Sequence, residues 1–358
     1  MRFDYHTAYG QDRELLRHAG ERIAYGLLVV ALVVAPALLP RFYVGELTYL
    51  FIVCIASLGL MVLIGYTGQV SLGHAAFMAI GAYAHAAMLA AGVPLVVSLI
   101  AAAMIAGAVG GAIGIPAIRT TGLYLAMVTL AFAFIVEHVA GRWKALTGGF
   151  TGLSVPKPLL FGLDVGTVTG FYYFTAAILI VVLLGLVNLM RSRTGRAFIA
   201  LRDSEAAAYG LGVDVARYKI IAFVISASVC GLAGGLLAHH LRHLTPEAFN
   251  LLLSMELLLM VVIGGLGSLH GAILGAILIG LLPAAISALK PMLPDRVAQQ
   301  SGLEIFLFGL VLTAFVLFEP RGLYGRWLKL RHFADYFPLY RRDTARRVKT
   351  YMKSERYR

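Results

Sequence analysis

The segment RSRTGRAFIALRDSEAAAYGLGVDVARYK, residues 191–219, decides the fold because it is the one long polar interruption in an apolar sequence. An apolar run of membrane length ends before it, and another begins after it. Five of its residues are arginines, at positions 191, 193, 196, 202 and 217. Cytoplasmic loops of membrane proteins carry an excess of Lys and Arg. The sequence therefore predicts that this segment lies on the cytoplasmic face of a membrane.

The same segment carries signals for local structure. Thr194 and either Asp203 or Ser204 are suitable helix N-caps, and the alanines that follow favour helix. Gly210 and Gly212 supply a C-terminal stop. We therefore expect two short helices at the membrane face, with small alanines that allow another surface to dock closely. The alternative is a solvated, arginine-rich loop that only fixes the topology.

The composition supports a membrane protein. Of 358 residues, 60% are hydrophobic and 13% are charged, whereas soluble domains average about 45–50% and about 25%. The net charge of +12 does not indicate a nucleic-acid partner, because the basic residues gather in the last forty positions and in alternate short loops. Cys54 and Cys230 lie within apolar runs, so we expect packing residues rather than redox or metal groups.

The pattern of apolar runs predicts an all-α polytopic membrane protein with about ten transmembrane helices, since a span needs about 20 mostly apolar residues. Both termini are then cytoplasmic by the distribution of Lys and Arg. The expected division is a cytoplasmic segment 1–22, a transmembrane domain 23–318 with the cytoplasmic loop 191–217, and a basic tail 319–358. The expected spans are 23–39, 45–64, 70–91, 94–115, 121–140, 170–190, 218–240, 254–268, 270–288 and 302–318.

Two glycine-rich stretches depart from ordinary spans: GYTGQVSLGHAAF at 65–77 and GGLGSLHGAILG at 264–275. Polar groups at such depth are costly unless they are buried against protein or line a wet cavity. Glycines also permit close packing of helices, which is the alternative explanation. The candidate translocation residues are Gly68, Gln69, Ser71, Gly73, His74, Glu137 and Glu256. The acids lie near span ends, where each could instead reach interfacial water.

The outer loops invite two further interpretations. The stretch 147–158 is rich in glycine and proline, so turns are expected there rather than a domain. His239, His240 and His243 lie close together in the sequence, but no carboxylate or cysteine completes a metal-ligand set. We therefore expect no metal site.

Five motifs in order make the sequence similar to one known family. They are the 65–77 stretch, LTGGFTGL at 146–153, RDSEAAA at 202–208, GGLGSL at 264–269 and FEPRGL at 318–323. Together they resemble the LivM-type permease of branched-chain amino acid (hydrophobic amino acid and amide uptake) ABC importers, over about residues 45–325. His270 and the extended basic tail depart from that pattern.

The resemblance implies an ABC-importer permease fold with a cytoplasmic coupling helix, in a bacterial inner membrane. Implied partners are a second homologous permease, two cytoplasmic ABC ATPases, a periplasmic substrate-binding protein and membrane lipid. The implied ATPase-coupling residues are Arg196, Arg202, Asp203, Glu205, Ala206, Ala207, Gly210 and Gly212.

The sequence has no Gly-x-x-x-x-Gly-Lys-[Ser/Thr] phosphate loop, so we expect no ATPase site, no enzymatic activity and no cofactor in this chain. Alternatives are a permease for urea, short amides or other amino acids, or an ion-coupled secondary transporter. A structural subunit of a larger membrane complex would leave the cytoplasmic loop unexplained.

Overall fold

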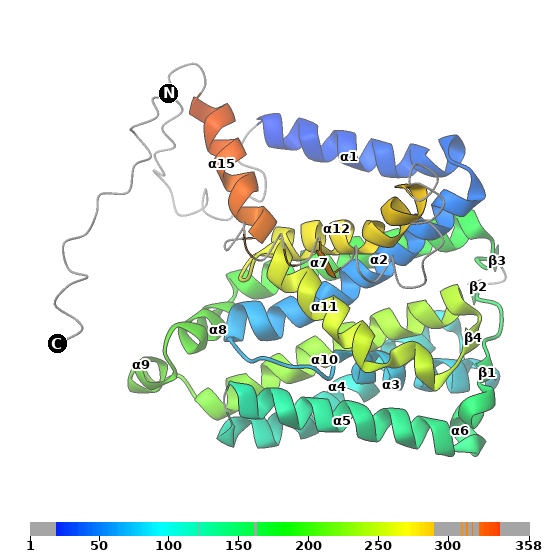
Figure 1. Cartoon of the computed structure of the whole chain (residues 1–358), viewed down its shortest axis with the longest axis horizontal. Helices are drawn as coiled ribbons and strands as arrows, with labels where there is room; N and C mark the ends of the chain where they lie inside the picture. Colours follow the sequence, from blue (N-terminus) through cyan, green and yellow to red (C-terminus); the bar gives the residue numbers. More distant parts are fainter. Residues whose placement is uncertain are drawn as a thin grey trace.

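A computed structural model describes residues 19–120, 122–160, 163–289 and 322–336, and single helical positions between 309 and 317. The described chain is a bundle of helices, most of which run roughly along one direction (Figure 1). The long helices are α1 (Ala19–Leu38), α2 (Arg41–Met61), α3 (His74–Ala90), α4 (Leu95–Arg119), α5 (Leu123–Arg142), α7 (Val168–Arg191), α10 (Val215–Leu241), α11 (Leu251–Gly264), α12 (Leu269–Leu289) and α15 (Gly322–Tyr336).

Short elements join these helices. The π-helix η2 (Val62–Tyr66) continues α2, and α8 (Arg193–Asp203) and α9 (Glu205–Gly210) connect α7 to α10. The remainder are α6 (Lys144–Thr147), the 3₁₀ helices η3 (Gly149–Thr151) and η4 (Pro246–Phe249), and the strands β1 (Leu153–Ser154), β2 (Leu159–Leu160), β3 (Leu163–Asp164) and β4 (His243–Leu244).

The helices match the predicted class, an all-α polytopic membrane protein. Among the described residues, 6 helical segments are long and apolar enough to cross a membrane: Arg41–Tyr66, Leu95–Arg119, Leu123–Arg142, Val168–Arg191, Val215–Leu241 and Pro246–Gly264. Shorter apolar helices cover Tyr25–Leu38, His74–Ala90 and Leu269–Ala284. The predicted spans from 23–39 to 270–288 each overlap a helix. The last, 302–318, lies mostly outside the described residues, so a total of ten stays a prediction.

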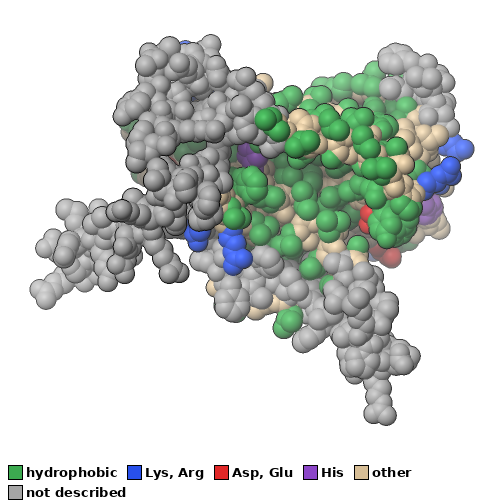
Figure 2. All heavy atoms as spheres, turned by 90° about the horizontal axis from the view of Figure 1, so that it is seen from above, with side chains coloured by type: hydrophobic (Ala, Val, Ile, Leu, Met, Phe, Trp, Pro, Cys, Tyr) green, Lys and Arg blue, Asp and Glu red, His purple; other side chains and the backbone are tan. Residues whose placement is uncertain are grey.

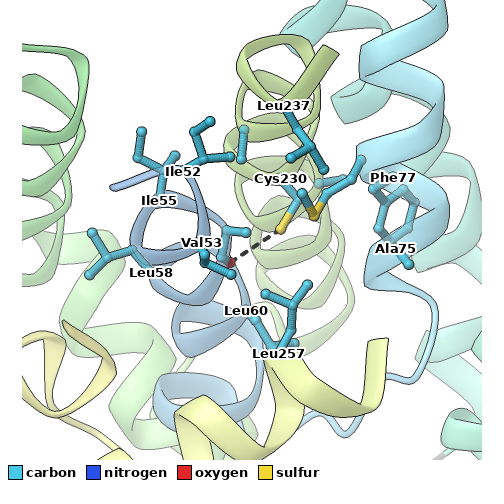
Figure 3. Packing of buried hydrophobic residues seen from close by; sticks show 14 of the residues in the cluster. Ile52, Val53, Ile55, Leu58, Leu60, Ala75, Phe77, Cys230, Leu237 and Leu257 are labelled. Atoms are coloured by element: carbon cyan, nitrogen blue, oxygen red, sulfur yellow. Dashed lines mark hydrogen bonds between the residues drawn. The ribbon is translucent and has the colours of Figure 1, made fainter. Parts of the chain in front are cut away.

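Helix α2 lies at the centre of the bundle. Of the 18 residues in the most apolar part of Arg41–Tyr66, which joins α2 and η2, 89% are buried. The corresponding shares are 28% in α5 and 11% in α7. The side chains of α2 pack with those of α7, α10, α11 and α12. Figure 3 shows Leu60 of α2 beside Leu257 of α11, and Val53 of α2 facing Cys230 of α10. Both cysteines are buried in this core, and the Cys230 thiol donates to the Ala56 carbonyl at 3.4 Å. Their interpretation as packing residues is confirmed.

Small residues let α3, α4 and α10 approach closely. A Cβ on Gly81 of α3 would collide with the Gly231 carbonyl of α10, and one on Gly234 would collide with the Met78 carbonyl. Such small-residue contacts are typical of membrane helices, where close backbone approach replaces the hydrophobic effect as a source of cohesion. They hold the core around α2 rigid.

Outward-facing apolar side chains cover the peripheral helices. Val30 of α1, Met104 of α4, Ile135 of α5 and Val181 of α7 are each at least half exposed. Figure 2 shows one such face, largely hydrophobic, with the visible charged side chains toward its edges. A surface of this kind is suited to contact with lipid rather than water.

The loops that follow α5 and α10 are tied together by short strands. Strand β1 pairs antiparallel with β4, which opposes Leu153 to Leu244 and Ser154 to His243. The three histidines of this region point to different partners: His239 contacts His85 at 2.8 Å, His240 packs on the Tyr49 ring, and His243 bonds the Thr151 carbonyl at 3.0 Å. Residues 147–158 therefore contain the end of α6, the short 3₁₀ helix η3, the two-residue strand β1 and irregular connections, and no separate domain.

Candidate coupling and translocation sites

The polar segment after α7 forms the two short helices that the sequence predicts, α8 and α9. Their N-caps are Ser192, whose Oγ accepts from the Thr194 amide at 3.2 Å, and Ser204, whose Oγ accepts from the Ala207 amide at 3.2 Å. Thr194 is therefore the wrong cap, because α7 ends at Arg191 and the next helix begins only two residues later. Asp214 caps α10 in the same way.

Helix α9 presents an uncovered apolar surface. Ala206 and Ala207 are exposed, and the exposed fractions of Tyr209 and Leu211 are 76% and 82%. Within α9 only Ala208 is buried. The helix projects from one end of the bundle (Figure 1). Apolar side chains that stand free at a polar end of a membrane protein indicate a docking surface.

A short ion pair fixes the base of α9. Glu205 Oε1 lies 2.8 Å from Lys219 Nζ, and the Lys219 side chain is only 3% exposed. A nearly buried ammonium needs a partner, so this pair holds the start of α9 against α10. Arg196, on α8, donates to the Arg191 carbonyl at 3.2 Å and closes the α7–α8 corner. Gly210 has open space around it, and Gly212 has φ +80°, which favours glycine.

The Arg202 side chain lies between α8 and the first glycine-rich stretch. Its Nε and Nη2 both donate to Asp203 Oδ1 at 3.2 Å, and its Nη1 donates to the Gly65 carbonyl at 3.2 Å. Residues 191–219, which we name the coupling segment after the role that the sequence predicts, thus contact the end of the central α2–η2 helix directly.

The first glycine-rich stretch breaks the helix. After η2 the chain turns at Gly68, whose φ is +72°, and the Gln69 amide bonds back to the Leu63 carbonyl at 3.2 Å. Gln69 is buried, and its Nε2 donates to Thr67 Oγ1 at 2.9 Å. Its Oε1 has no hydrogen-bond partner among the described residues. We name residues 65–73 the first break.

His74, at the start of α3, is fully buried and joined to its surroundings by hydrogen bonds. The Ser226 hydroxyl donates to the Gly59 carbonyl at 2.7 Å, so it accepts from His74 Nε2 at 2.8 Å. His74 Nδ1 then accepts from the Ser71 hydroxyl at 3.0 Å. The chain of bonds runs from the first break through α3 to α10 and α2.

The amide groups at the start of α3 also find side-chain partners. The Leu72 amide donates to Thr129 Oγ1 of α5 at 3.0 Å, and the Ala75 amide donates to Ser254 Oγ of α11 at 3.0 Å. Glycine is required at position 73 because the Cβ of any other residue would lie 2.6 Å from the Thr129 carbonyl oxygen, which is too close. A helix start inside a bundle leaves orphan amides, and here neighbouring hydroxyls satisfy them.

The second glycine-rich stretch forms a tight turn between α11 and α12, which we name the second break, residues 264–271. Gly265 and Gly267 have φ of +112° and +83°, and Ser268 Oγ accepts from the Gly271 amide at 3.2 Å. His270 is exposed, and its Nε2 lies 2.9 Å from the Tyr25 hydroxyl of α1. Its ring also stacks on Tyr324 of α15.

The two candidate acids lie apart from the first break. Glu137 lies with His138, Phe134 and Phe150 on an open groove of about 580 Å³ near the C-terminal end of α5. Glu256 is partly buried on α11. The structure therefore groups Gln69, Ser71, Gly73 and His74 at one junction and places the acids elsewhere.

Several residues around the start of α3 were not predicted from the sequence. Thr129, Ser226 and Ser254 lie within apolar runs and supply the hydroxyls that surround α3. The sequence does contain an indication of their role, because a hydroxyl group inside a membrane span needs a hydrogen-bond partner. In the sequence Lys219 marks only the end of a polar segment, and its spacing does not indicate Glu205 as a partner.

The chain is similar to permease components of amino acid transport systems. The model of a family described as "Branched-chain amino acid transport system / permease component" matches residues 42–317. The chain is 37% identical over 289 residues to the high-affinity branched-chain amino acid transport system permease protein LivM of Escherichia coli, covering 73% of this chain and 68% of that protein. For LivM of Salmonella typhimurium the match is 37% over 278 residues, with 71% and 65% covered.

A second type of relative also matches. The LivH permease protein of Salmonella typhimurium is 26% identical over 288 residues, which cover 75% of this chain and 90% of LivH. No solved structure matches the chain. The chain spans about two thirds of the length of the LivM relatives and almost the whole length of LivH.

Proposed function

The chain belongs to the family of branched-chain amino acid transport permeases, and we propose that it is one subunit of the membrane pathway of an ABC importer for these amino acids. The observation that carries the proposal is the coupling segment. It is a pair of short helices with an uncovered apolar tip, anchored through Lys219 to α10 and bonded through Arg202 to the first break.

The proposed machine contains other chains. LivH resembles this protein along 90% of its own length, which supports a second, homologous permease as the partner across the pathway. Two cytoplasmic ATPases supply the energy by docking on α9, and a periplasmic protein delivers the substrate. Residues 191–217 and both termini then face the cytoplasm of a bacterial inner membrane, the orientation that the arginines favour.

In this proposal the substrate passes between the two permeases. The first break, with Gly68, Gln69, Ser71 and His74, changes its packing as the pathway opens and closes. Gln69 Oε1 is a buried acceptor with no partner among the described residues, so it can accept from an ammonium group once the first break opens. The groove beside Glu137 lies at the outer mouth. Glu256 borders α11.

The first experiment is affinity purification of the tagged protein from its native membrane. We expect a second permease and two ATPase chains in the same complex. The complex in proteoliposomes, with the binding protein and ATP, should then take up leucine and valine. Uptake of urea instead would replace the substrate class, and recovery of the chain without any ATPase would contradict the proposal.

A variant of α9 tests the docking surface itself. Gly210→Leu fills open space, so it should leave the subunit folded while it obstructs an ATPase groove. We expect at least a tenfold loss of ATP-driven uptake, on the scale of a clash in a binding pocket. The matched control is Gly185→Leu, which also has open space around it but lies on the long helix α7 rather than on α9. Equal uptake by both variants would contradict docking at α9.

A further inference from the structure

Three separate parts of the chain meet at one guanidinium group. Arg202 belongs to the end of α8, Gly65 to the end of η2, and Gly267 to the turn between α11 and α12. Arg202 Nη1 donates to the Gly65 carbonyl at 3.2 Å. A Cβ built on Gly267 would lie 2.6 Å from the same nitrogen, so Gly267 provides the room that the guanidinium occupies. The two breaks also touch one another, because a Cβ on Gly65 would lie 2.8 Å from the Gly267 amide nitrogen.

The guanidinium is held in a defined orientation. Asp203 Oδ1 accepts from both Nε and Nη2, which leaves Nη1 directed at the Gly65 carbonyl. Gly68 packs against the aliphatic part of Arg202, with a Cβ there 3.5 Å from Cγ. Arg presents its donors in a planar fork, so one side chain can bond to an acid and a carbonyl at the same time. The side chain is 37% exposed, so it is a link at the edge of the bundle rather than a core residue.

Both backbones in contact with Arg202 are of the kind that can change conformation. Gly65 lies in a π-helix, and such segments often mark functional sites. Gly68, Gly265 and Gly267 have positive φ and can rotate without the clash that a Cβ imposes. The helices on either side are closely packed, and packed elements shift relative to one another rather than deform continuously. A displacement of α8 would therefore be absorbed at the two breaks.

We propose that Arg202 is a positioning residue that makes the two breaks respond together to a movement of the coupling segment. It ties the cytoplasmic end of α2–η2 and the α11–α12 turn to α8, so that both follow the ATPases. This rests on the proposed function, in which the ATPases move α9. Without the guanidinium, α8 still moves but the first and second breaks no longer follow it.

The test uses the complete complex in proteoliposomes, with hydrogen exchange of the backbone amides measured with and without ATP. In the wild type, we expect ATP to change exchange at 205–212, 65–73 and 264–271. In Arg202→Gln the response at 205–212 should persist, whereas the responses at both breaks should be lost. Substrate transported per ATP hydrolysed should fall about tenfold, the scale of one hydrogen bond to a charged group.

Two further variants separate positioning from simple structural support. Arg202→Lys keeps the charge but not the fork, so it should recover only part of the transport ratio. Asp203→Ala removes an acid that is 66% exposed, so folding should be preserved while the guanidinium loses its orientation; we expect about a threefold lower ratio, on the scale of one weakened hydrogen bond. The matched control is Arg193→Gln, an exposed arginine at the other end of α8 whose side chain forms no hydrogen bond or ion pair with the described residues, and it should behave as wild type.

The outcomes are distinguishable. Loss of response at both breaks with a retained response at 205–212 supports the inference. Normal responses at the breaks and a normal transport ratio in both Arg202→Gln and Asp203→Ala would overturn it while leaving docking at α9 intact. An absence of any ATP response at 205–212 in the wild type would instead overturn the docking itself, and the link with it.

Discussion

The two glycine-rich breaks contain similar letters, SLGHAA at 71–76 and SLHGAI at 268–273, but they build different structures. In the first, His74 is fully buried and bonded to Ser71 and Ser226, and α3 begins deep in the bundle. In the second, His270 is exposed and bonded to Tyr25, and the chain turns tightly at the end of the bundle. The stretch with Gly before His forms a buried polar junction, whereas the stretch with His before Gly forms a surface turn.

The reason lies in the spacing from the serine. Ser71 and His74 are three residues apart, so both can face the same side as the helix begins, and the serine hydroxyl reaches Nδ1. Ser268 and His270 are two residues apart, so they face different sides. Ser268 Oγ instead caps the Gly271 amide. The difference teaches that a short sequence echo does not define equivalent sites.

The largest effect is expected at the second break. Gly264→Ala places a Cβ against the Gly271 carbonyl, where neither backbone can move without opening the turn. We expect a loss of about 3 kcal/mol in the free energy of unfolding, as for overpacking in a rigid core. The measurement is SDS-induced unfolding of the purified protein in micelles. Gly185→Ala in α7 is the control, because it has open space and should leave stability unchanged. Equal stability of the two variants would mean that the turn is loose.

The second test addresses the first break. His74→Ala removes the acceptor of Ser71 and the donor to Ser226 and leaves a small cavity beside Phe77. We expect a loss of about 2 kcal/mol, because hydrogen bonds within membrane bundles contribute modestly and the remainder is lost packing. The same unfolding assay measures it, with Ser226→Ala as a milder companion at about 1 kcal/mol. A wild-type unfolding curve for His74→Ala would show that the junction has no structural role.

Much of this architecture is readable from the sequence, for identifiable reasons. Apolar runs located nine of the helices, because lipid demands about 20 apolar residues for each span. The arginines indicated the coupling segment, and polar residues within an apolar span indicated Gln69, Ser71 and His74 as candidate site residues. What the sequence could not supply was long-range pairing. The link from Arg202 to Gly65 spans 137 positions, and that from His74 to Ser226 spans 152. No local pattern predicts such partners.

A third, smaller effect concerns the base of α9, which differs from both breaks in being an ion pair. Glu205→Gln leaves the nearly buried Lys219 ammonium without its carboxylate. Because Glu205 is 43% exposed, water can replace part of the interaction, and we expect a loss of only about 1 kcal/mol. Its sharper signature should be faster hydrogen exchange at 205–212 than in the wild type. Exchange at 65–73 should change less, since Arg202 still holds that contact.

The smallest effect is expected for His270→Ala, which makes the same substitution as His74→Ala in the other break. The imidazole is exposed, so its bond to the Tyr25 hydroxyl competes with water, and its ring centroid lies 6.4 Å from that of Tyr324. Water can replace the imidazole at the Tyr25 hydroxyl, because the Tyr25 side chain is itself exposed. We expect a change of about 0.5 kcal/mol or less in the free energy of unfolding, as at surface positions. A loss as large as that of His74→Ala would mean that α1 and α15 close over the second break and stabilise it as strongly as the hydroxyls stabilise the first.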